Sequence, residues 1–112
     1  MIKLQNRDMF QSFGSSFTKL MLIDSLPVNL KLSLTKLKRS LIDQAADVQA
    51  VNETLRKSAD SGDITNEAGQ SQYNELMETS FDVDFQPVSV NLIASKLSAD
   101  DLFNLTPLLK EE

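Results

Sequence analysis

The feature that most constrains this chain is an apolar stripe that repeats every seven residues over four heptads. Its first column contains Leu34, Leu41, Val48 and Leu55. Its second column, offset by three positions, contains Leu30, Leu37, Gln44 and Val51. Alternating spacings of three and four place both columns on one face of a helix. The pattern predicts a single helix from Pro27 to Ser58, about 45 Å long at 1.5 Å per residue.

Two explanations compete for what covers this heptad face. In the first, the face packs inside the molecule against a preceding helix and the C-terminal segment. In the second, it is a seam between subunits, and Gln44 is the polar position that sets the register of the seam. The sequence leaves both open.

An amphipathic segment precedes the long helix. Asn6 is a good N-cap residue, and helical spacing follows it in Met9, Phe10, Phe13, Phe17, Leu20 and Met21. We expect a first helix from Asp8 to Ile23, weakened or kinked at Gly14. Together with the long helix it would form a helical hairpin over residues 7–58.

The remaining residues, 63–112, form an acidic segment of short elements. Thr65 or Asn66 caps a predicted helix from Glu67 to Thr79. Period-two alternation then predicts one bent strand or two short strands, with apolar positions at Phe81, Val83, Phe85, Val88, Val90 and Leu92. Ile2 and Leu4 are expected to supply a further strand. Ser98 opens a final helix, Ala99 to Leu105, in a capping box.

The fold predicted from these elements is mainly α. It is a single domain, residues 1–112, in which a helical hairpin with one long helix carries a small C-terminal segment with one or two short β-strands. The chain has 112 residues, so its core is modest, and self-association would add stability.

The composition excludes much of enzyme chemistry. Cysteine, histidine and tryptophan are absent, which removes disulfides, Cys/His zinc sites and His-based catalysis. No glycine-rich phosphate-binding motif is present. Carboxylates cluster only at a polar turn and on one strand face, at Asp60, Asp63, Glu67, Asp82 and Asp84, where solvated side chains are expected. We therefore expect no enzyme, no catalytic residue, no metal and no cofactor.

The charge is distributed unevenly along the chain. Residues 1–57 carry a net charge of +4 and residues 58–112 a net charge of −9. The halves would attract each other within the fold, stay solvated, or stack between copies. A total charge of −5 and a pI near 4.6 argue against nucleic-acid binding. Neither a membrane span nor a signal peptide is expected.

The order of short motifs resembles a loose group of small proteins encoded by tailed bacteriophages and prophages. The resemblance rests on five motifs: Ile2-Lys3-Leu4, Asn6-Arg7-Asp8, Leu26-Pro27-Val28-Asn29-Leu30, Tyr73-Asn74-Glu75-Leu76 and Leu97-Ser98-Ala99-Asp100-Asp101-Leu102. It brings no catalytic residues, and it implies a phage origin. The expected function is that of an oligomeric structural or assembly protein of the virion, in its head, neck or tail. The alternatives are a small acidic inhibitor of a host or defence protein, or an assembly chaperone absent from the particle.

Such a protein would act in the virion, or in the host cytoplasm during assembly. Its expected partners are other phage structural proteins, further copies of itself, or both. The candidate partner-binding residues lie on the heptad face and in the strand region: Leu34, Leu37, Leu41, Val48, Val51, Leu55, Phe81, Val83, Phe85, Val88 and Val90.

Overall fold

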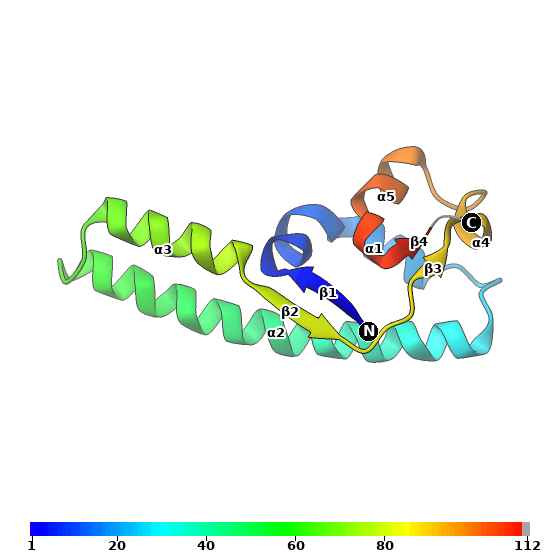
Figure 1. Ribbon diagram of the computed structural model, residues 1–112, viewed down its shortest axis with the longest axis horizontal. Helices are drawn as coiled ribbons and strands as arrows, with labels where there is room; N and C mark the ends of the chain where they lie inside the picture. The colour runs from blue at the N-terminus through cyan, green and yellow to red at the C-terminus, as the bar shows by residue number, and fades with distance from the viewer. Residues whose placement is uncertain (111–112) are drawn as a thin grey trace.

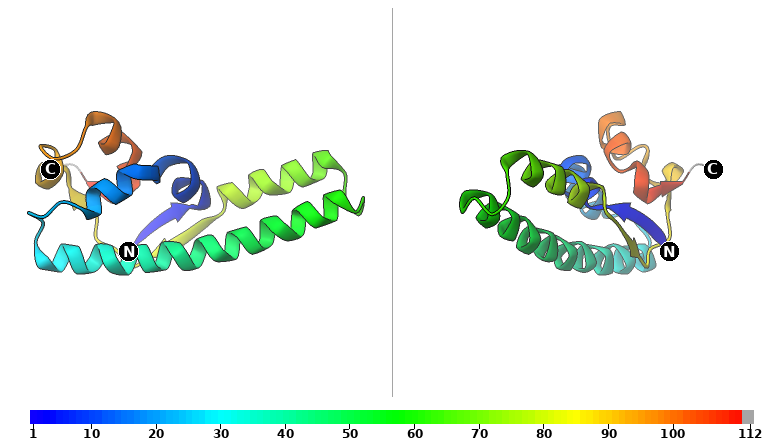
Figure 2. Two further views of the ribbon diagram at one scale, coloured as in Figure 1. Left: turned by 180° about the vertical axis from the view of Figure 1, so that it is seen from behind. Right: turned by 60° about the vertical axis from the view of Figure 1, so that its left-hand side comes forward.

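One long helix sets the dimensions of the molecule. The computed structural model describes residues 1–110, and Glu111 and Glu112 lie outside the described residues. Helix α2, Val28–Asp60, has 33 residues and runs along most of the molecule, whose extents are 52 × 24 × 21 Å. The other elements lie along one side of α2 (Figures 1 and 2). The predicted long helix is confirmed, with two additional residues at its C-terminal end.

The second arm of the hairpin is helix α3, Asn66–Glu78. The turn between α2 and α3 contains Gly62, whose φ of 82° favours glycine. Thr65, one of the two predicted caps, caps α3 by accepting a hydrogen bond from the backbone N–H of Ala68 at 3.0 Å. We call residues 48–78 the arm, and the rest of the described chain the body. The arm extends away from the body in Figure 1.

The mainly α fold with a helical hairpin and one long helix is confirmed, but the predicted hairpin over residues 7–58 is wrong. The N-terminal helical segment makes few backbone contacts with α2, whereas α3 runs beside it along the arm. The segment is divided into a π-helix η1, Asp8–Phe13, and an α-helix α1, Gly14–Met21. Gly14 has a φ of 45°, and this left-handed residue divides the predicted helix into two short pieces.

Two small sheets complete the body. Strand β1, Ile2–Gln5, pairs antiparallel with β2, Ser80–Val83, so that Ile2 lies opposite Val83. Strand β3, Val88–Ser89, pairs in parallel with β4, Leu109–Lys110. The predicted N-terminal strand is confirmed.

The prediction that the chain stays extended as far as Leu92 is wrong after Ser89. The chain forms a helical turn, α4, Val90–Ile93. A helical turn places Val90 and Ile93 on the same side, whereas a strand would place them on opposite faces. Ile93 is fully buried and Val90 is half-buried, so packing into the body outweighs the alternating pattern.

The C-terminal elements agree with the sequence. Helix α5, Ala99–Asn104, begins at Ser98, whose hydroxyl accepts from the backbone N–H of Asp101 at 3.1 Å. A 3-10 turn, η2, Thr106–Leu108, follows it. The main core cluster lies wholly in the body and consists of Leu4, Phe13, Leu20, Ile23, Leu26, Leu34, Leu37, Leu41, Val83, Phe85, Val88, Ile93, Leu105 and Leu108.

Candidate protein-docking site

Most of the residues predicted to bind a partner are used inside the chain itself. Seven of them are buried: Leu34, Leu37, Leu41, Val48, Val83, Phe85 and Val88. Leu55, Phe81 and Val90 are half-buried. Val51 is 48% exposed. In this conformation the first two thirds of the heptad face pack within the molecule, and the face is not free to form a subunit seam.

Gln44 interrupts the apolar stripe because it forms part of a buried polar node. Its side-chain amide donates to Asn6 Oδ1 at 2.9 Å, and Asn6 Nδ2 donates to the carbonyl of Leu76 at 2.7 Å. The backbone N–H of Asn6 also donates to the carbonyl of Thr79 at 3.0 Å. The prediction that Asn6 caps the first helix is wrong. Asn6 is 1% exposed and ties the base of the arm to the body.

An apolar groove lies between the N-terminal helical segment and α2. Its volume is about 240 Å³, and it is lined by Met9, Phe10, Phe13, Gly14, Phe17, Lys38, Leu41, Ile42 and Ala45. Phe10 is 41% exposed and Ile42 is 57% exposed. A large aromatic and a large aliphatic side chain therefore face solvent at one hollow, which we call the Phe10 groove.

Three phenylalanines build the aromatic wall. Phe10 and Phe13 belong to η1 and Phe17 belongs to α1, and all three line the groove. Phe13 is 3% exposed, and its ring stacks on Phe17 with centroids 6.2 Å apart and planes at 22°. Phe13 thus anchors the wall in the core, while Phe10, one turn earlier, remains at the surface. The apolar spacing was visible in the sequence, but the exposure of Phe10 was not.

The α2 wall of the groove carries one basic side chain, Lys38, which lines the groove directly. Lys31, one heptad earlier, lies on the same side of α2, whereas Lys36 and Arg39 lie on other sides of the helix. The groove therefore combines apolar walls with a positive charge at its edge.

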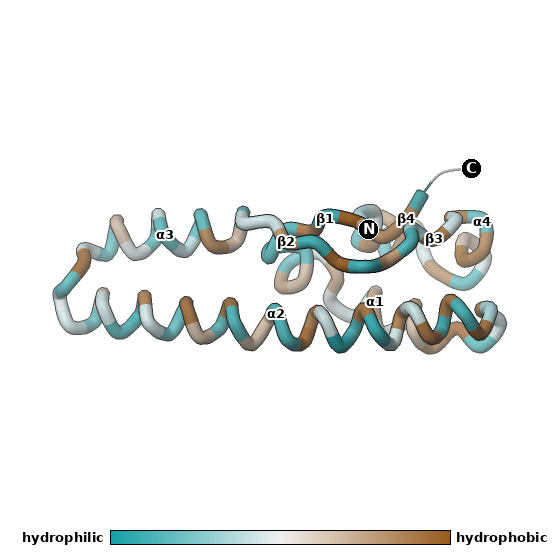
Figure 3. Tube along the Cα trace, turned by 60° about the horizontal axis from the view of Figure 1, so that its bottom comes forward, coloured by the Kyte–Doolittle hydropathy of each residue, from teal (hydrophilic) through white to brown (hydrophobic). Residues whose placement is uncertain are grey.

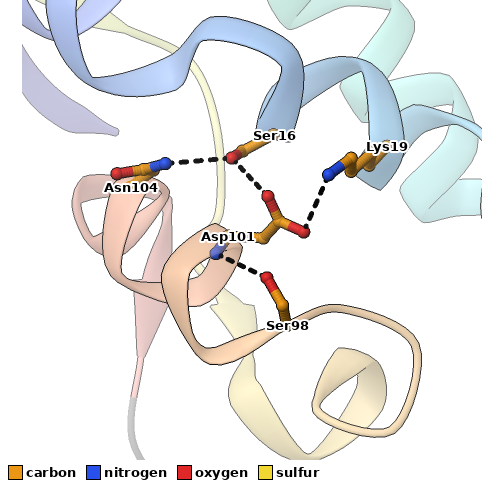
Figure 4. Close-up of polar contacts among 5 residues, drawn as sticks. All are labelled: Ser16, Lys19, Ser98, Asp101 and Asn104. Carbon is orange, nitrogen blue, oxygen red and sulfur yellow. Dashed lines mark hydrogen bonds and ion pairs between the residues drawn. The ribbon is translucent and has the colours of Figure 1, made fainter.

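A second polar cluster joins α1 to α5 (Figure 4). Ser16 Oγ donates to Asp101 Oδ1 at 2.7 Å, and Lys19 Nζ lies 3.4 Å from Asp101 Oδ2. Asn104 Nδ2 donates to Ser16 Oγ at 3.2 Å. The hydrogen bond from Ser16 holds the pKa of Asp101 below its ordinary value, with further lowering from Ser98 and the Lys19 ammonium against an opposing effect of burial.

This cluster is a structural link between two helices. Ser16 is 2% exposed, so its hydroxyl cannot meet a substrate. A carboxylate whose pKa is lowered is also a weak base for activating a serine. Sequence analysis identified the capping residue Ser98 but had no signal that would pair Ser16 with Asp101, 85 positions away.

The carboxylates of the polar turn and of the β2 strand face are placed as solvated side chains. Asp82 lies 3.9 Å from Lys3 across the β1–β2 pair, and Asp63 accepts from Ser61 Oγ at 3.0 Å within the turn. Among residues 1–110, no three or more acidic side chains gather closely enough to hold a metal ion. No helix in the described part of the chain has the length and apolar character needed to cross a membrane.

Comparisons with known proteins were made for the whole chain. No protein-family model matches it, and no curated protein or solved structure is significantly similar to it.

Proposed function

We propose that this chain is a non-enzymatic protein that works by binding another protein at the Phe10 groove. The observation that carries the proposal is the joint exposure of Phe10 and Ile42 at an apolar hollow. Exposed aromatic side chains at a hollow are typical anchors of protein interfaces. Neither side chain contributes to the main core cluster, so their exposure serves no evident purpose in folding.

The size of the groove favours a protein partner over a small ligand. Ligand pockets usually measure about 300–1,000 Å³, and the Phe10 groove measures about 240 Å³. This volume suits one or two apolar side chains projecting from a partner. An amphipathic helix presents its anchors in this way when it lies in a groove.

Charge selects the kind of segment that would bind. Lys38 at the groove, with Lys31 one heptad earlier on the same side of α2, would repel a basic segment and attract an acidic one. The partner segment is therefore an acidic amphipathic helix with large apolar anchors on one face. A charged surround contributes mainly to the association rate and to specificity, while the apolar anchors contribute most of the affinity.

The biological setting that we propose comes from the resemblance to small tailed-phage proteins. In that setting the protein is a structural or assembly component of the virion that contacts other phage proteins. A second candidate function, an acidic inhibitor of a host protein, is favoured by α3, which carries three glutamates and no basic side chain.

The test places a photo-crosslinking phenylalanine analogue at position 10 and, as control, at Gln72, an exposed position on α3. Crosslinks formed in phage-producing cells and in purified particles are identified by mass spectrometry. We expect position 10, and not position 72, to crosslink to an acidic amphipathic segment of one phage protein. A peptide of that segment should then bind the wild-type chain at least about tenfold more tightly than the Phe10→Ser variant.

The outcomes separate the candidates. Crosslinks within purified particles support a virion component, whereas crosslinks to a phage protein only in cells support an assembly chaperone. A position-72 crosslink to a basic host protein, with none at position 10, would favour the inhibitor and contradict the groove proposal.

A further inference from the structure

Helix α2 has a second face, opposite the heptad face, that no other element covers. The body and α3 lie on the same side of α2, so the far side is open along its length (Figures 1 and 2). We call this the outer face and define it by eight exposed residues: Val28, Leu32, Thr35, Arg39, Ala46, Ala50, Glu53 and Lys57. Val28 is 78% exposed and Leu32 is 54% exposed.

These eight residues form one continuous stripe. At about 100° per residue they fall within an arc of about 60° around the helix. Leu32, Arg39, Ala46 and Glu53 are each seven positions apart. The stripe thus repeats the heptad spacing of the buried face on the opposite side, with Ile42 of the Phe10 groove at its edge. This second heptad array is weaker in apolar character than the first.

Charge is distributed along α2 in a way that selects an orientation for a second helix. On the outer face itself, Arg39 lies in the N-terminal half of α2, and Glu53 and Lys57 lie in the C-terminal half. Two copies of α2 in parallel would place each of these charges on its own counterpart. Two antiparallel copies can place Arg39 against Glu53, which is the complementary arrangement.

We propose that two copies of this chain pair through the outer faces of α2, antiparallel, about a two-fold axis beside Ala46. In this register Arg39 lies across from Glu53 of the second copy, and the pair occurs twice because the interface is isologous. Ala46 meets its own counterpart at the axis, and Ala50 lies next to it on the stripe. Small side chains there allow the helices to approach closely. This surface shares only Ile42, at its edge, with the Phe10 groove, and dimerisation goes beyond the function proposed for the groove.

The expected affinity is modest. The outer face offers far fewer than the 20–30 residues per partner of a standard interface. In this register Ala50 lies across from Ile42 and Leu32 lies across from Asp60, while Val28 extends past the end of α2 of the second copy. The apolar contribution therefore comes chiefly from Ile42 and the two alanines. We therefore expect dimerisation weaker than the micromolar affinity at the weak end of standard interfaces.

The test is sedimentation velocity of the whole chain over a concentration series that extends to the highest soluble concentration. Wild-type protein should shift from monomer to dimer. Ala46→Arg places an unpaired charge at the axis and should raise the Kd at least about tenfold. The control Gln72→Arg makes the same change in charge on exposed α3 and should leave the Kd unchanged. Leu32→Glu, also at an exposed position, serves as a second disruptive change. Circular dichroism checks that each variant is folded.

A charge exchange tests the register. Arg39→Glu alone should weaken the dimer, because it brings carboxylates together at both ends of the seam. The double variant Arg39→Glu, Glu53→Arg should restore dimerisation. A wild-type chain that remains monomeric throughout, a dimer that survives Ala46→Arg, or a double variant no better than Arg39→Glu alone would each overturn the proposal.

Discussion

The body and the arm are held together by different amounts of buried apolar surface. All fourteen residues of the main core cluster lie in the body. In the arm, the only buried apolar side chains among the described residues are Val48 and Met77. Figure 3 shows α3 coloured mostly from teal to pale, with few strongly hydrophobic positions.

The difference shows that a long regular hairpin does not require a large core of its own. The α2 part of the arm continues a helix that the body has already nucleated, and propagation of a helix costs far less than its nucleation. Helix α3 then needs only a few contacts with α2. Ala59 and Gly69 lie close enough that a Cβ at Gly69 would be 3.8 Å from Ala59 Cβ. We therefore expect the arm to open locally without global unfolding.

The largest test of this comparison truncates one leucine in each region. Leu20, in the body, is fully buried, whereas Leu55, in the arm, is half-buried. Leu20→Ala should lower the free energy of unfolding by about 2–5 kcal/mol. Leu55→Ala should cost about 1 kcal/mol, because less of its side chain is buried. Urea denaturation followed by circular dichroism measures both. Equal losses would show that the arm and the body share one core.

The next test cuts the link between the two regions. Asn6→Ala leaves the Gln44 amide and the Leu76 carbonyl without their buried partner, at a cost of about 1–3 kcal/mol. Hydrogen exchange should accelerate most in α3, since the base of the arm is released. Asn74→Ala, which removes an exposed hydrogen bond to Gln70, is the matched control. Acceleration spread evenly over the chain would argue against a role for Asn6 as the link.

Acid should weaken the body before it affects the arm. The pKa of Asp101 is lowered in the folded state, so the folded protein binds this proton less readily than the unfolded chain does. The stabilisation is present above the unfolded-state pKa, near pH 4, and is lost as pH falls through the lower folded-state value.

Melting temperatures measured between about pH 6 and pH 2 test this acid effect. Asp101→Asn should flatten the acid limb of the melting-temperature profile, whereas Asp100→Asn at the exposed neighbouring position should leave it steep. If both variants retain the wild-type profile, Asp101 is not responsible for the acid sensitivity of the body.

The smallest expected effect concerns the two helix caps. Thr65→Ala removes the cap of α3 and should cost about 1 kcal/mol within the arm. We expect faster amide exchange in α3 with little change in the global melting temperature. Ser98→Ala, the equivalent change in the body, should lower that melting temperature instead. The reverse result would mean that the arm is the more cooperative region.

Much of the local structure was predictable because it depends on short-range chemistry. The heptad spacing predicted α2 almost to the residue, and the caps at Thr65 and Ser98 predicted the starts of α3 and α5. The alternation around Val83 predicted β2. In each case the signal lies within a few residues, where backbone hydrogen bonding and side-chain periodicity act directly.

The candidate site was predictable only in part. The spacing of Phe10, Phe13 and Phe17 was evident, but nothing local distinguishes the buried Phe13 from the exposed Phe10. That distinction depends on where the segment crosses α2, and Gly14, with its φ of 45°, sets this crossing by dividing the helical segment. The buried partners of Gln44 and Asp101 could not be predicted either, because they are distant in sequence and only the packing of the elements brings them together.

By itself, the sequence determined a long amphipathic helix, its flanking short elements, and a chain without the residues that most enzymes and metal sites use. Only the tertiary structure decided that α3 is the second arm of the hairpin and that most of the heptad face is internal. It also decided that Val90 begins a helical turn and that the opposite face of α2 is left uncovered. Periodicity specifies which face of a helix is apolar, but the partner of that face is selected by packing among all elements at once.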